Sequence, residues 1–495
     1  MTEAELVFIP SPGRGHLQAV VQLAAVLVDR DSRLSVTVLS IPPLVSVPDS
    51  QGEIPVDSSR IRCVNVPPSG FSRPSEMPRF PFLFMQGFIS SHRDNVRNEV
   101  GKLLEDSGSG GSRARLAGFV VDMFCTCMID VADEFSVPAY VFFTSGASYL
   151  GLMFHIQGLL EYNKQDLMAF KNSPESIDAP SYKHPFPAKL LPQITFWVPD
   201  GPAFFNLTAD YRRAKGILIN TFLELETHGI NSFSGDEKFP PVYPIGPMIY
   251  FGNDDKNPKL SVIINWLDEQ PDSSVVFLCF GSRGSFDDDQ VKEIAAGLER
   301  SGQRFLWSLR RPPMPGRLNL PRDYENHDDI LPEGFLRRTA GIGKIIGWAP
   351  QVAVLSHRAV GGFVSHCGWN SILESLWFGV PIATWPMYAE QQPNAFQLVK
   401  DLEVAVEIKM EYYTDIFVGG DCSGIVTADE IDGGIRKLMD AGNHRIGGKV
   451  KAMKEKCRAA LSENGTSSDY IRKFIIKWFI KWFIKWFLKY IKCSF

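Results

Sequence analysis

The feature that most constrains the fold is an alternation of short apolar runs with longer amphipathic stretches, found once in each half of the chain. In the first half the apolar runs are ELVFIP, LSVTVLS, LAGFVVDM, AYVFFTS and GILINTF, with helical patterns such as HLQAVVQLAAVLVDR between them. In the second half SVVFLCFGS, FLWSLR, GGFVSHC and VPIATWP alternate with DDDQVKEIAAGLERSG and WNSILESLWFG. Continuous apolar runs separated by helices are typical of a parallel sheet covered on both faces. The sequence therefore predicts an α/β protein.

Two such units agree with the length of 495 residues, which is too great for one hydrophobic core. The segment FPPVYPIGPMIYFGNDDKNPKL, rich in proline and polar residues, lies between the two alternations and is predicted to be an inter-domain linker. We expect a first domain at residues 1–245 and a second at 246–470. A ligand cleft is expected between the two sheets, where α/β folds usually bind ligands.

Composition and charge disfavour several classes of protein. The chain has 51 basic and 56 acidic residues, so no overall positive field attracts nucleic acid. It has no run of eighteen apolar residues for a membrane span, and its acidic start is unlike a signal peptide. Eight scattered cysteines do not form a disulfide framework. We expect a monomeric cytoplasmic protein with reduced thiols.

The common nucleotide and metal motifs are missing from the sequence. GRGHLQ at Gly13–Gln18 begins like G-x-G-x-x-G but has glutamine in place of the third glycine, and no phosphate-binding loop of the G-x-x-x-x-G-K-[ST] type occurs. No acidic residue closes LSVTVLS, so a nucleotide-dependent oxidoreductase, the nearest enzyme of another class, is disfavoured. The nine histidines form no H-x-x-x-H pair, so we expect no metal and no cofactor.

The most informative stretch runs from Trp348 to Gln391. In it the strand GGFVSH passes into CGWNS, where a helix is predicted to begin. Gly368 lets the backbone approach a ligand, and Asn370 and Ser371 offer capping groups at the helix N-terminus. Free N–H groups and the helix dipole favour a phosphate there, and His366 can donate one more hydrogen bond.

The rest of this stretch offers partners for a base and for sugars. Glu374, one turn into the helix, can accept ribose hydroxyls, and Trp348 can present a flat face to a base. Glu390 and Gln391 follow the next strand with acceptors and donors for hydroxyls. Taken singly, Trp348 is more typical of packing and Glu374 of a solvated helix. Together these residues are suited to a base, a ribose, a diphosphate and a sugar.

This 44-residue stretch resembles the signature box of the plant UDP-dependent family 1 glycosyltransferases in its length and in its first and last residues. PSPGRGHL, VVDMFC, YVFFTSGAS, GILINTFLELE, YPIGP, FLCFGSRGSF and LPEGF also match, so the resemblance covers about residues 5–470. It implies a GT-B fold of two Rossmann-like domains facing a central cleft, with the acceptor on the first and the UDP-sugar on the second. The segment order is most similar to the branch that glucosylates flavonoids and other phenolics.

The resemblance also assigns residues to the donor. Those implied to bind UDP are Ser282, Trp348, Ala349, Gln351, His366, Gly368, Asn370, Ser371 and Glu374. Those implied to meet the sugar are Thr144, Trp369, Glu390 and Gln391. A terminal glutamine is associated with glucose donors, and Trp369 stands where users of glucuronate tend to carry arginine. We therefore expect UDP-glucose as the donor.

Transfer to a hydroxyl needs a base near neutral pKa, for which histidine is suited. His16 lies at the turn between the first predicted strand and helix, facing the expected cleft. By resemblance it is the base, Asp122 orients it, and the reaction inverts the anomeric centre. By itself His16 is more typical of a helix start bonded to backbone, and Asp122 is equally compatible with a helix N-cap. A non-catalytic sugar-nucleotide binder is disfavoured because both residues are present.

The acceptor is not identified by the sequence beyond a small lipophilic molecule, a flavonoid, another phenolic or a terpenoid. Five aromatic residues are candidates for its pocket, although core packing explains each at least as well. They are Phe84, Phe124, Phe142, Phe196 and Trp197. Four histidines, His92, His155, His184 and His357, are interpreted as structural.

The segment 471–495 departs from the family pattern. From Arg472 onward it has seven basic residues and no acid, and the unit K-W-F-[IL] repeats every four residues. On a helix of 3.6 residues per turn the lysines therefore spiral rather than form one polar face. A cationic membrane- or partner-binding helix is one interpretation, and a sequence expansion without a role is the preferred one. Truncation near Asp469 is accordingly expected to preserve activity.

Overall fold

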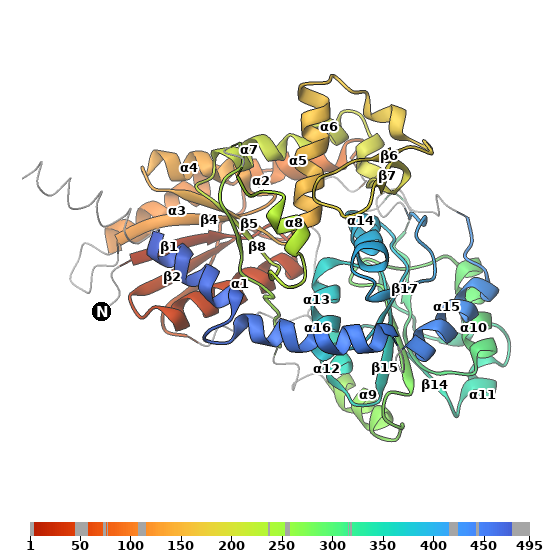
Figure 1. The fold of residues 1–495 in the computed structure, drawn as a ribbon. Helices are drawn as coiled ribbons and strands as arrows, with labels where there is room; N and C mark the ends of the chain where they lie inside the picture. Colours follow the sequence, from red (N-terminus) through yellow and green to blue (C-terminus); the bar gives the residue numbers. More distant parts are fainter. Residues whose placement is uncertain are drawn as a thin grey trace, which may run out of the picture.

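Two parallel β-sheets, one from each half of the chain, form the framework of the structure, with helices on both faces of each sheet (Figure 1). The computed structural model describes residues 4–44, 58–72, 76, 78–106, 115–235, 238–252, 258–314, 316, 319–414, 424–441 and 445–477. The α/β prediction is confirmed. All strands of the first sheet precede residue 245 and all strands of the second follow it, while the domain boundary itself stays a prediction.

The first sheet has the strand order β3-β2-β1-β4-β5-β8-β9, and every neighbouring pair is parallel. Its strands are β1 (Ala4–Ile9), β2 (Leu34–Ser40), β3 (Ile61–Asn65), β4 (Arg115–Asp122), β5 (Ala139–Phe143), β8 (Ile217–Ile219) and β9 (Val242–Pro244). Its helices are α1 (Arg14–Arg30), α2 (Pro81–Ser90), α3 (Arg93–Asp106), α4 (Ile129–Glu134), α5 (Ala147–Glu161), α6 (Asp200–Phe205), α7 (Leu207–Arg213) and α8 (Thr227–Asn231). A short hairpin of β6 (Ser176–Ile177) and β7 (Phe186–Pro187) lies outside it.

The prediction of an inter-domain linker is wrong in part. Its segment Val242–Pro244 forms the edge strand β9, which pairs with β8 through Ile217 and Val242. The pairing buries Tyr243 in the core of the first sheet. The linker is therefore shorter than the proline-rich composition predicted.

The second sheet has the order β14-β11-β10-β15-β16-β17, again with parallel neighbours. Its strands are β10 (Val275–Cys279), β11 (Arg304–Ser308), β14 (Gly343–Ile346), β15 (Val360–Ser365), β16 (Ile382–Thr384) and β17 (Ala405–Glu407). Its helices are α9 (Pro258–Asp268), α10 (Asp288–Ser301), α11 (Phe335–Thr339), α12 (Gln351–Ser356), α13 (Trp369–Phe378), α14 (Gln391–Phe396), α15 (Ala428–Ala441) and α16 (Arg445–Leu461). A π-helical turn, η8 (Gln397–Asp401), continues α14, and β12 (Arg310–Arg311) pairs with β13 (Arg322–Asp323).

The two halves meet where strands of each sheet end. The side chain of Asn370, at the start of α13, donates to the backbone oxygen of Gly15, at the start of α1, over 3.4 Å. The indole N–H of Trp369 donates to the backbone oxygen of Asn220, just after β8, over 2.7 Å. Side chains at the carboxyl ends of both sheets are thereby brought to one interface.

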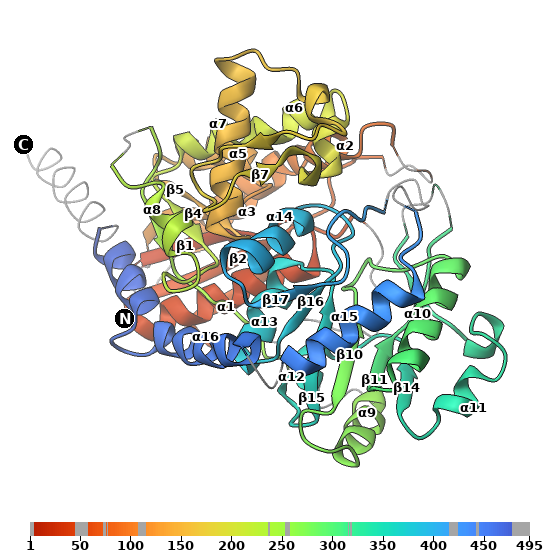
Figure 2. The same ribbon diagram turned by 45° about the vertical axis from the view of Figure 1, so that its right-hand side comes forward.

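The chain returns to the first sheet after α16. Residues 466–477 are helical and lie against the first sheet, beside α1, in both views (Figures 1 and 2). Ile471, Phe474 and Ile475 are buried, and the Phe474 ring packs edge-on against Tyr140 at 4.9 Å between centroids. The predicted tail 471–495 therefore begins inside a packed helix, and this packing argues against the expectation that ending the chain near Asp469 is harmless. Residues 478–495 lie outside the described residues.

The described helices also bear on membrane insertion. Across the described ranges, no helix has both the length and the apolar character that crossing a bilayer requires.

Candidate active site

His16 and Asp122 are brought together from positions 106 residues apart. His16 lies in the first turn of α1, and Asp122 is the last residue of β4, which pairs with β1. The Nδ1 atom of His16 lies 2.8 Å from Oδ2 of the fully buried Asp122. A carboxylate can only accept, so Nδ1 carries the proton and Nε2 keeps its lone pair. His16 is 30% exposed, so its ring can be approached from outside.

The Asp122 carboxylate is fixed from its other side. Its Oδ1 accepts from the hydroxyl of Ser11 and from the backbone N–H of Phe124, the latter over 3.2 Å. The hydroxyl of Thr144 lies 3.1 Å from Nδ1 of His16. Thr144 was predicted to reach the sugar, and the structure places its hydroxyl against the histidine. The histidine ring is therefore oriented by two side chains.

The surroundings of His16 raise its pKa. Burial alone lowers this pKa, but the charge of Asp122, the hydrogen bond to Asp122 and the charge of Glu390 together outweigh burial. Glu390 is the residue before α14, so an acidic group of the second half acts on the histidine of the first half. The arrangement is suited to take up a proton and to stabilise the resulting imidazolium.

The N-terminus of α13 carries no side-chain cap. Gly368 is its N-cap residue and has extended backbone angles, and no side chain caps the helix there. The preceding Cys367 has φ +63, a left-handed conformation that non-glycine residues rarely adopt. The predicted capping by Asn370 and Ser371 is absent: the Asn370 amide N–H is donated to the Gly15 backbone oxygen, and the Ser371 hydroxyl accepts from Gln351. The first N–H groups of α13 are thus left without a side-chain partner from its N-cap residue, as anion binding requires.

His366 lies beneath this helix start. Burial lowers its pKa to about 4, partly opposed by a hydrogen bond with the Cys279 backbone, so the ring is neutral near pH 7. An added Cβ at Gly281 or Gly368 would lie 2.6 or 2.5 Å from Nε2 of His366. Gly281 also has φ +74, and the exposed Ser282 follows it. Glycine at both positions therefore lets two loops close around the imidazole.

A hydrogen-bonded set one turn into α13 includes a carboxyl group of unusual pKa. The amide of Gln351 donates to Oε2 of Glu374 over 2.6 Å and to the hydroxyl of Ser371 over 2.8 Å. Burial raises the pKa of Glu374 to about 7, partly opposed by the Gln351 hydrogen bond. A raised carboxyl pKa beside an uncapped helix N-terminus is typical of a ligand site.

Trp348 is held by an ion pair on one side. The guanidinium of Arg310 lies over its ring at 5.4 Å from the centroid, and Arg310 pairs with Asp323 at 3.1 Å. The backbone N–H of Trp348 donates to Asp323 over 2.9 Å. Trp348 is half-buried and the adjoining Ala349 is buried. One ring face is thus occupied by the cation, and a planar base can use only the other.

The predicted sugar-binding residues differ in their remaining hydrogen-bonding capacity. The Trp369 indole N–H is already donated to Asn220, and the ring is 3% exposed. The side-chain oxygen of Gln391 accepts the backbone N–H groups of Met387 and Tyr388, at 2.9 and 3.0 Å. Glu390 is half-buried, and burial raises its pKa although the charge of His16 opposes the shift. Trp369 therefore joins the two halves rather than offering its N–H to a ligand.

The predicted acceptor aromatics lie in different surroundings. The half-buried Phe124 packs edge-on against the His16 ring at 5.7 Å, and Phe204 lies 6.4 Å from Phe124. Phe84 and Trp197 are half-buried, and Phe196 is buried. Phe142 is a correction, because it is fully buried in the core cluster that packs against α1. Phe204, which the sequence did not single out, lies in the short helix α6 and packs against Phe124 as part of the buried core.

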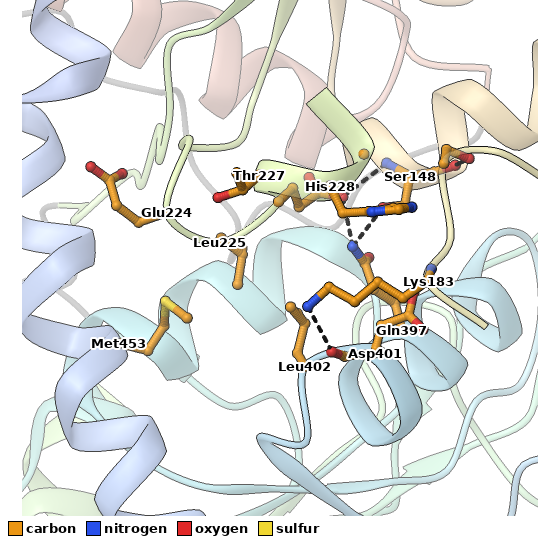
Figure 3. Close-up of a pocket in the computed structure, with 13 residues that line it drawn as sticks. Ser148, Lys183, Glu224, Leu225, Thr227, His228, Gln397, Asp401, Leu402 and Met453 are labelled. Atoms are coloured by element: carbon orange, nitrogen blue, oxygen red, sulfur yellow. Dashed lines mark hydrogen bonds between the residues drawn. The ribbon is translucent and has the colours of Figure 1, made fainter. Parts of the chain in front are cut away.

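Sequence reasoning also missed a set of residues that joins the halves on another side of the interface. Glu226, the last residue of GILINTFLELE, is 2% exposed and accepts three hydrogen bonds, one of them from Gln397 over 2.8 Å. Gln397 also donates to the hydroxyl of Ser148 over 2.7 Å, and Figure 3 shows it pointing toward Ser148 beside a cavity. Asp401 accepts from the backbone N–H of Lys183 at 3.0 Å. No sequence motif signals that these residues meet.

Two further observations concern a structural histidine and metal binding. His92 has hydrogen bonds to backbone at both ring nitrogens, at 2.9 and 3.3 Å, as a structural histidine does. Within the described ranges, no three His, Cys, Asp or Glu residues are placed to hold a metal ion.

Known proteins resemble this chain along nearly its whole length. Residues 238–416 match the family model described as "UDP-glucoronosyl and UDP-glucosyl transferase". A strawberry protein (Fragaria ananassa), described as a putative UDP-glucose flavonoid 3-O-glucosyltransferase, is 48% identical over 95% of this chain and 98% of its own length.

Solved structures give the same result. A UGT transferase from Siraitia grosvenorii, crystallised with UDP, is similar with a TM-score of 0.85 and 43% identity, over 96% of this chain and all of that one. UGT71G1 of Medicago truncatula, complexed with UDP-glucose, has a TM-score of 0.80 and 37% identity, over 96% of this chain and 98% of its own.

Proposed function

This chain belongs to the plant UDP-dependent glycosyltransferases of family 1 and has their GT-B fold, and from that premise we propose that it transfers glucose from UDP-glucose to a hydroxyl of a small phenolic acceptor, inverting the anomeric carbon. It is an enzyme of the hexosyltransferase class. The observation that supports this inverting transfer is the His16–Asp122 pair, whose charge environment includes Glu390 of the second half.

In the proposed reaction His16 is the general base. Its Nε2 takes the proton of the acceptor hydroxyl as the oxygen attacks the anomeric carbon from the face opposite UDP. A carbon–oxygen bond forms to the acceptor, the bond to the diphosphate breaks, and UDP leaves with the electron pair. An α-linked donor therefore gives a β-glucoside. The 2.8 Å contact with Asp122 stabilises the imidazolium, as in a Ser-His-Asp triad in which the acceptor hydroxyl replaces serine.

The leaving diphosphate is proposed to lie at α13. The uncapped N-terminus of this helix offers N–H groups and the positive end of a dipole. His366 is neutral near pH 7, so it acts by donating an N–H rather than as a cation. Trp348 stacks on uracil with the face that Arg310 leaves free, and Glu374 accepts from the ribose once it is ionised.

The sugar and acceptor assignments rest on the cleft side chains. Glu390 and the side-chain amide of Gln391 are polar groups suited to glucose hydroxyls, and neither supplies a cation for the carboxylate of a glucuronate. The half-buried Phe124 places an aromatic ring beside His16, which suits a planar phenolic acceptor, and the buried Phe204 packs against it. The strawberry relative's description as a flavonoid glucosyltransferase supports this acceptor class. The cytoplasm remains the expected compartment.

The test is a transfer assay with the purified protein. UDP-glucose is supplied with a panel of flavonoids and simple phenols, and NMR of the product gives the linkage position and the anomeric configuration. We expect a β-O-glucoside. His16→Ala is expected to lower kcat by about 10²–10⁴-fold with a weakly acidic acceptor, while calorimetry shows unchanged UDP binding.

A matched control is His357→Ala. His357 follows the last residue of α12, at the other end of that helix from Gln351, and its Nε2 lies 3.1 Å from Asp268. Loss of this side chain is expected to leave kcat unchanged. An α-glucoside product, or a His16→Ala enzyme with normal kcat, would contradict the proposed mechanism.

A further inference from the structure

Glu226 is a buried carboxylate outside the catalytic cleft, and both of its oxygens accept hydrogen bonds. It is 2% exposed and accepts the backbone N–H groups of Ala147 at 2.7 Å and Ser148 at 2.9 Å, the first two residues of α5. Its third partner is the side-chain amide of Gln397, at 2.8 Å, which comes from the second half of the chain. Burying a charge is costly unless it is hydrogen-bonded, so this carboxylate must be held by these three donors.

The turn that Glu226 holds leads directly to the reacting histidine. Thr144, whose hydroxyl lies 3.1 Å from Nδ1 of His16, is three residues before Ala147. Gly146 lies between them, and an added Cβ there would lie 2.9 Å from the Glu226 carboxylate and 2.8 Å from the Trp369 ring. The turn is therefore packed between Glu226 and the first residue of α13, and little movement of Thr144 is possible without moving either.

The same carboxylate reaches the other half through Gln397. The Gln397 amide, on η8, donates both to Glu226 and to the Ser148 hydroxyl, at 2.8 and 2.7 Å, and is 3% exposed. Figure 3 shows this side chain crossing the interface toward Ser148. Glu226 thus connects η8 of the second half with the turn that carries Thr144.

From these contacts we propose that Glu226 is a positioning residue for glycosyl transfer. It holds Thr144 against His16 and keeps the two halves in the relative position that transfer requires. The inference rests on the proposed function and assigns Glu226 no contact with substrate. A residue that served only as a helix cap would affect stability alone, which separates the two roles.

The first test is Glu226→Gln, which keeps the size of the side chain. One amide N–H would then face a donor, either a backbone N–H of α5 or the Gln397 amide. We expect kcat to fall roughly tenfold, a barrier change of about 1.4 kcal/mol, with the dissociation constant of UDP unchanged. The control is Thr427→Ala, which removes the Thr427–Glu430 cap of α15 and is expected to lower the melting temperature without changing kcat.

The second test exchanges the polarity across the interface. Gln397→Glu alone places two carboxylates together and is expected to lower kcat further than Glu226→Gln. The double variant Glu226→Gln with Gln397→Glu restores a donor–acceptor pair, so kcat should recover over Gln397→Glu alone. Gln397→Ala leaves intact the two hydrogen bonds that Glu226 accepts from the backbone of α5, so the cross-interface contact stays testable if the Glu226 variants do not fold. Unchanged kcat in Gln397→Ala, or no recovery in the double variant, would overturn the proposal.

A readout that needs no turnover separates failure of this proposal from failure of the proposed function. Hydrogen exchange of the Ala147 and Ser148 amides should be faster in Glu226→Gln than in the unaltered protein. If the unaltered protein transfers no glucose to any phenol while these amides behave as expected, the proposed function fails and the role of Glu226 in holding the turn stands. Unchanged exchange refutes that role whatever the activity.

Discussion

The return of the chain to the first sheet makes truncation a quantitative test of the fold. Ending the chain after Asp469 removes Ile471, Phe474 and Ile475, which are 1%, 2% and 6% exposed. Burial of such a side chain stabilises by about 1.5–3 kcal/mol, so the three contribute roughly 4.5–9 kcal/mol as an upper value. Because the free energy of unfolding of a typical protein is only about 5–15 kcal/mol, this loss is expected to leave the first domain mostly unfolded.

Ending the chain after Lys477 keeps all three side chains and is the matched comparison. We expect this form to keep its melting temperature and transfer activity, and the form ending at Asp469 to lose both, by circular dichroism and the glucoside assay. Phe474→Ala in the full chain isolates one side chain and is expected to cost about 3–5 kcal/mol. If the form ending at Asp469 had the same melting temperature as the form ending at Lys477, the assigned packing of this helix would be refuted.

Other expectations concern pH and the donor. Because the pKa of His16 is raised and only the neutral ring accepts a proton, kcat/KM should fall, as pH decreases, at a pH above that of an ordinary imidazole. Asp122→Asn removes the charge but leaves burial, so kcat should fall and the acidic limb of the profile should move to lower pH. Glu374 is ionised only above about pH 7, so KM for the donor should rise as pH falls through that value, and Glu374→Gln should abolish the dependence. UDP-glucose should exceed UDP-galactose and UDP-glucuronate in kcat/KM, and comparable values would refute the assigned roles of Glu390 and Gln391.

The central strands could be predicted from the sequence and the edges could not. β1, β4, β10 and β15 are buried on both faces and therefore read as continuous apolar runs. The edge strand β3 has the mixed sequence IRCVN with one buried residue, so no apolar run marks it. β9 has only three residues among prolines, and its pairing with β8 outweighs the turn composition that predicted a linker.

In the candidate site, too, local sequence patterns indicated individual residues, whereas the contacts between them depend on long-range packing. Sequence motifs pointed to His16 and Asp122, but only the parallel pairing of β1 with β4 brings them within hydrogen-bonding distance. Phe142 was assigned to the pocket although it lies in the run AYVFF, whose continuity itself indicates burial. The role of Trp369 depends on a backbone oxygen of Asn220, 149 residues away, which no local pattern indicates.

The returning C-terminal helix also determines how this enzyme can be recombined with its relatives. The chain passes between the halves twice, and the two crossings touch, since the Ser467 hydroxyl donates to the Gly246 backbone oxygen over 2.6 Å. A chimera joined only within the linker would therefore place the last helix of one parent on the first sheet of the other. Exchange of donor specificity between family members should use two junctions, one near Gly246 and one near Ser467, so that residues 466–477 stay with the sheet that they cover.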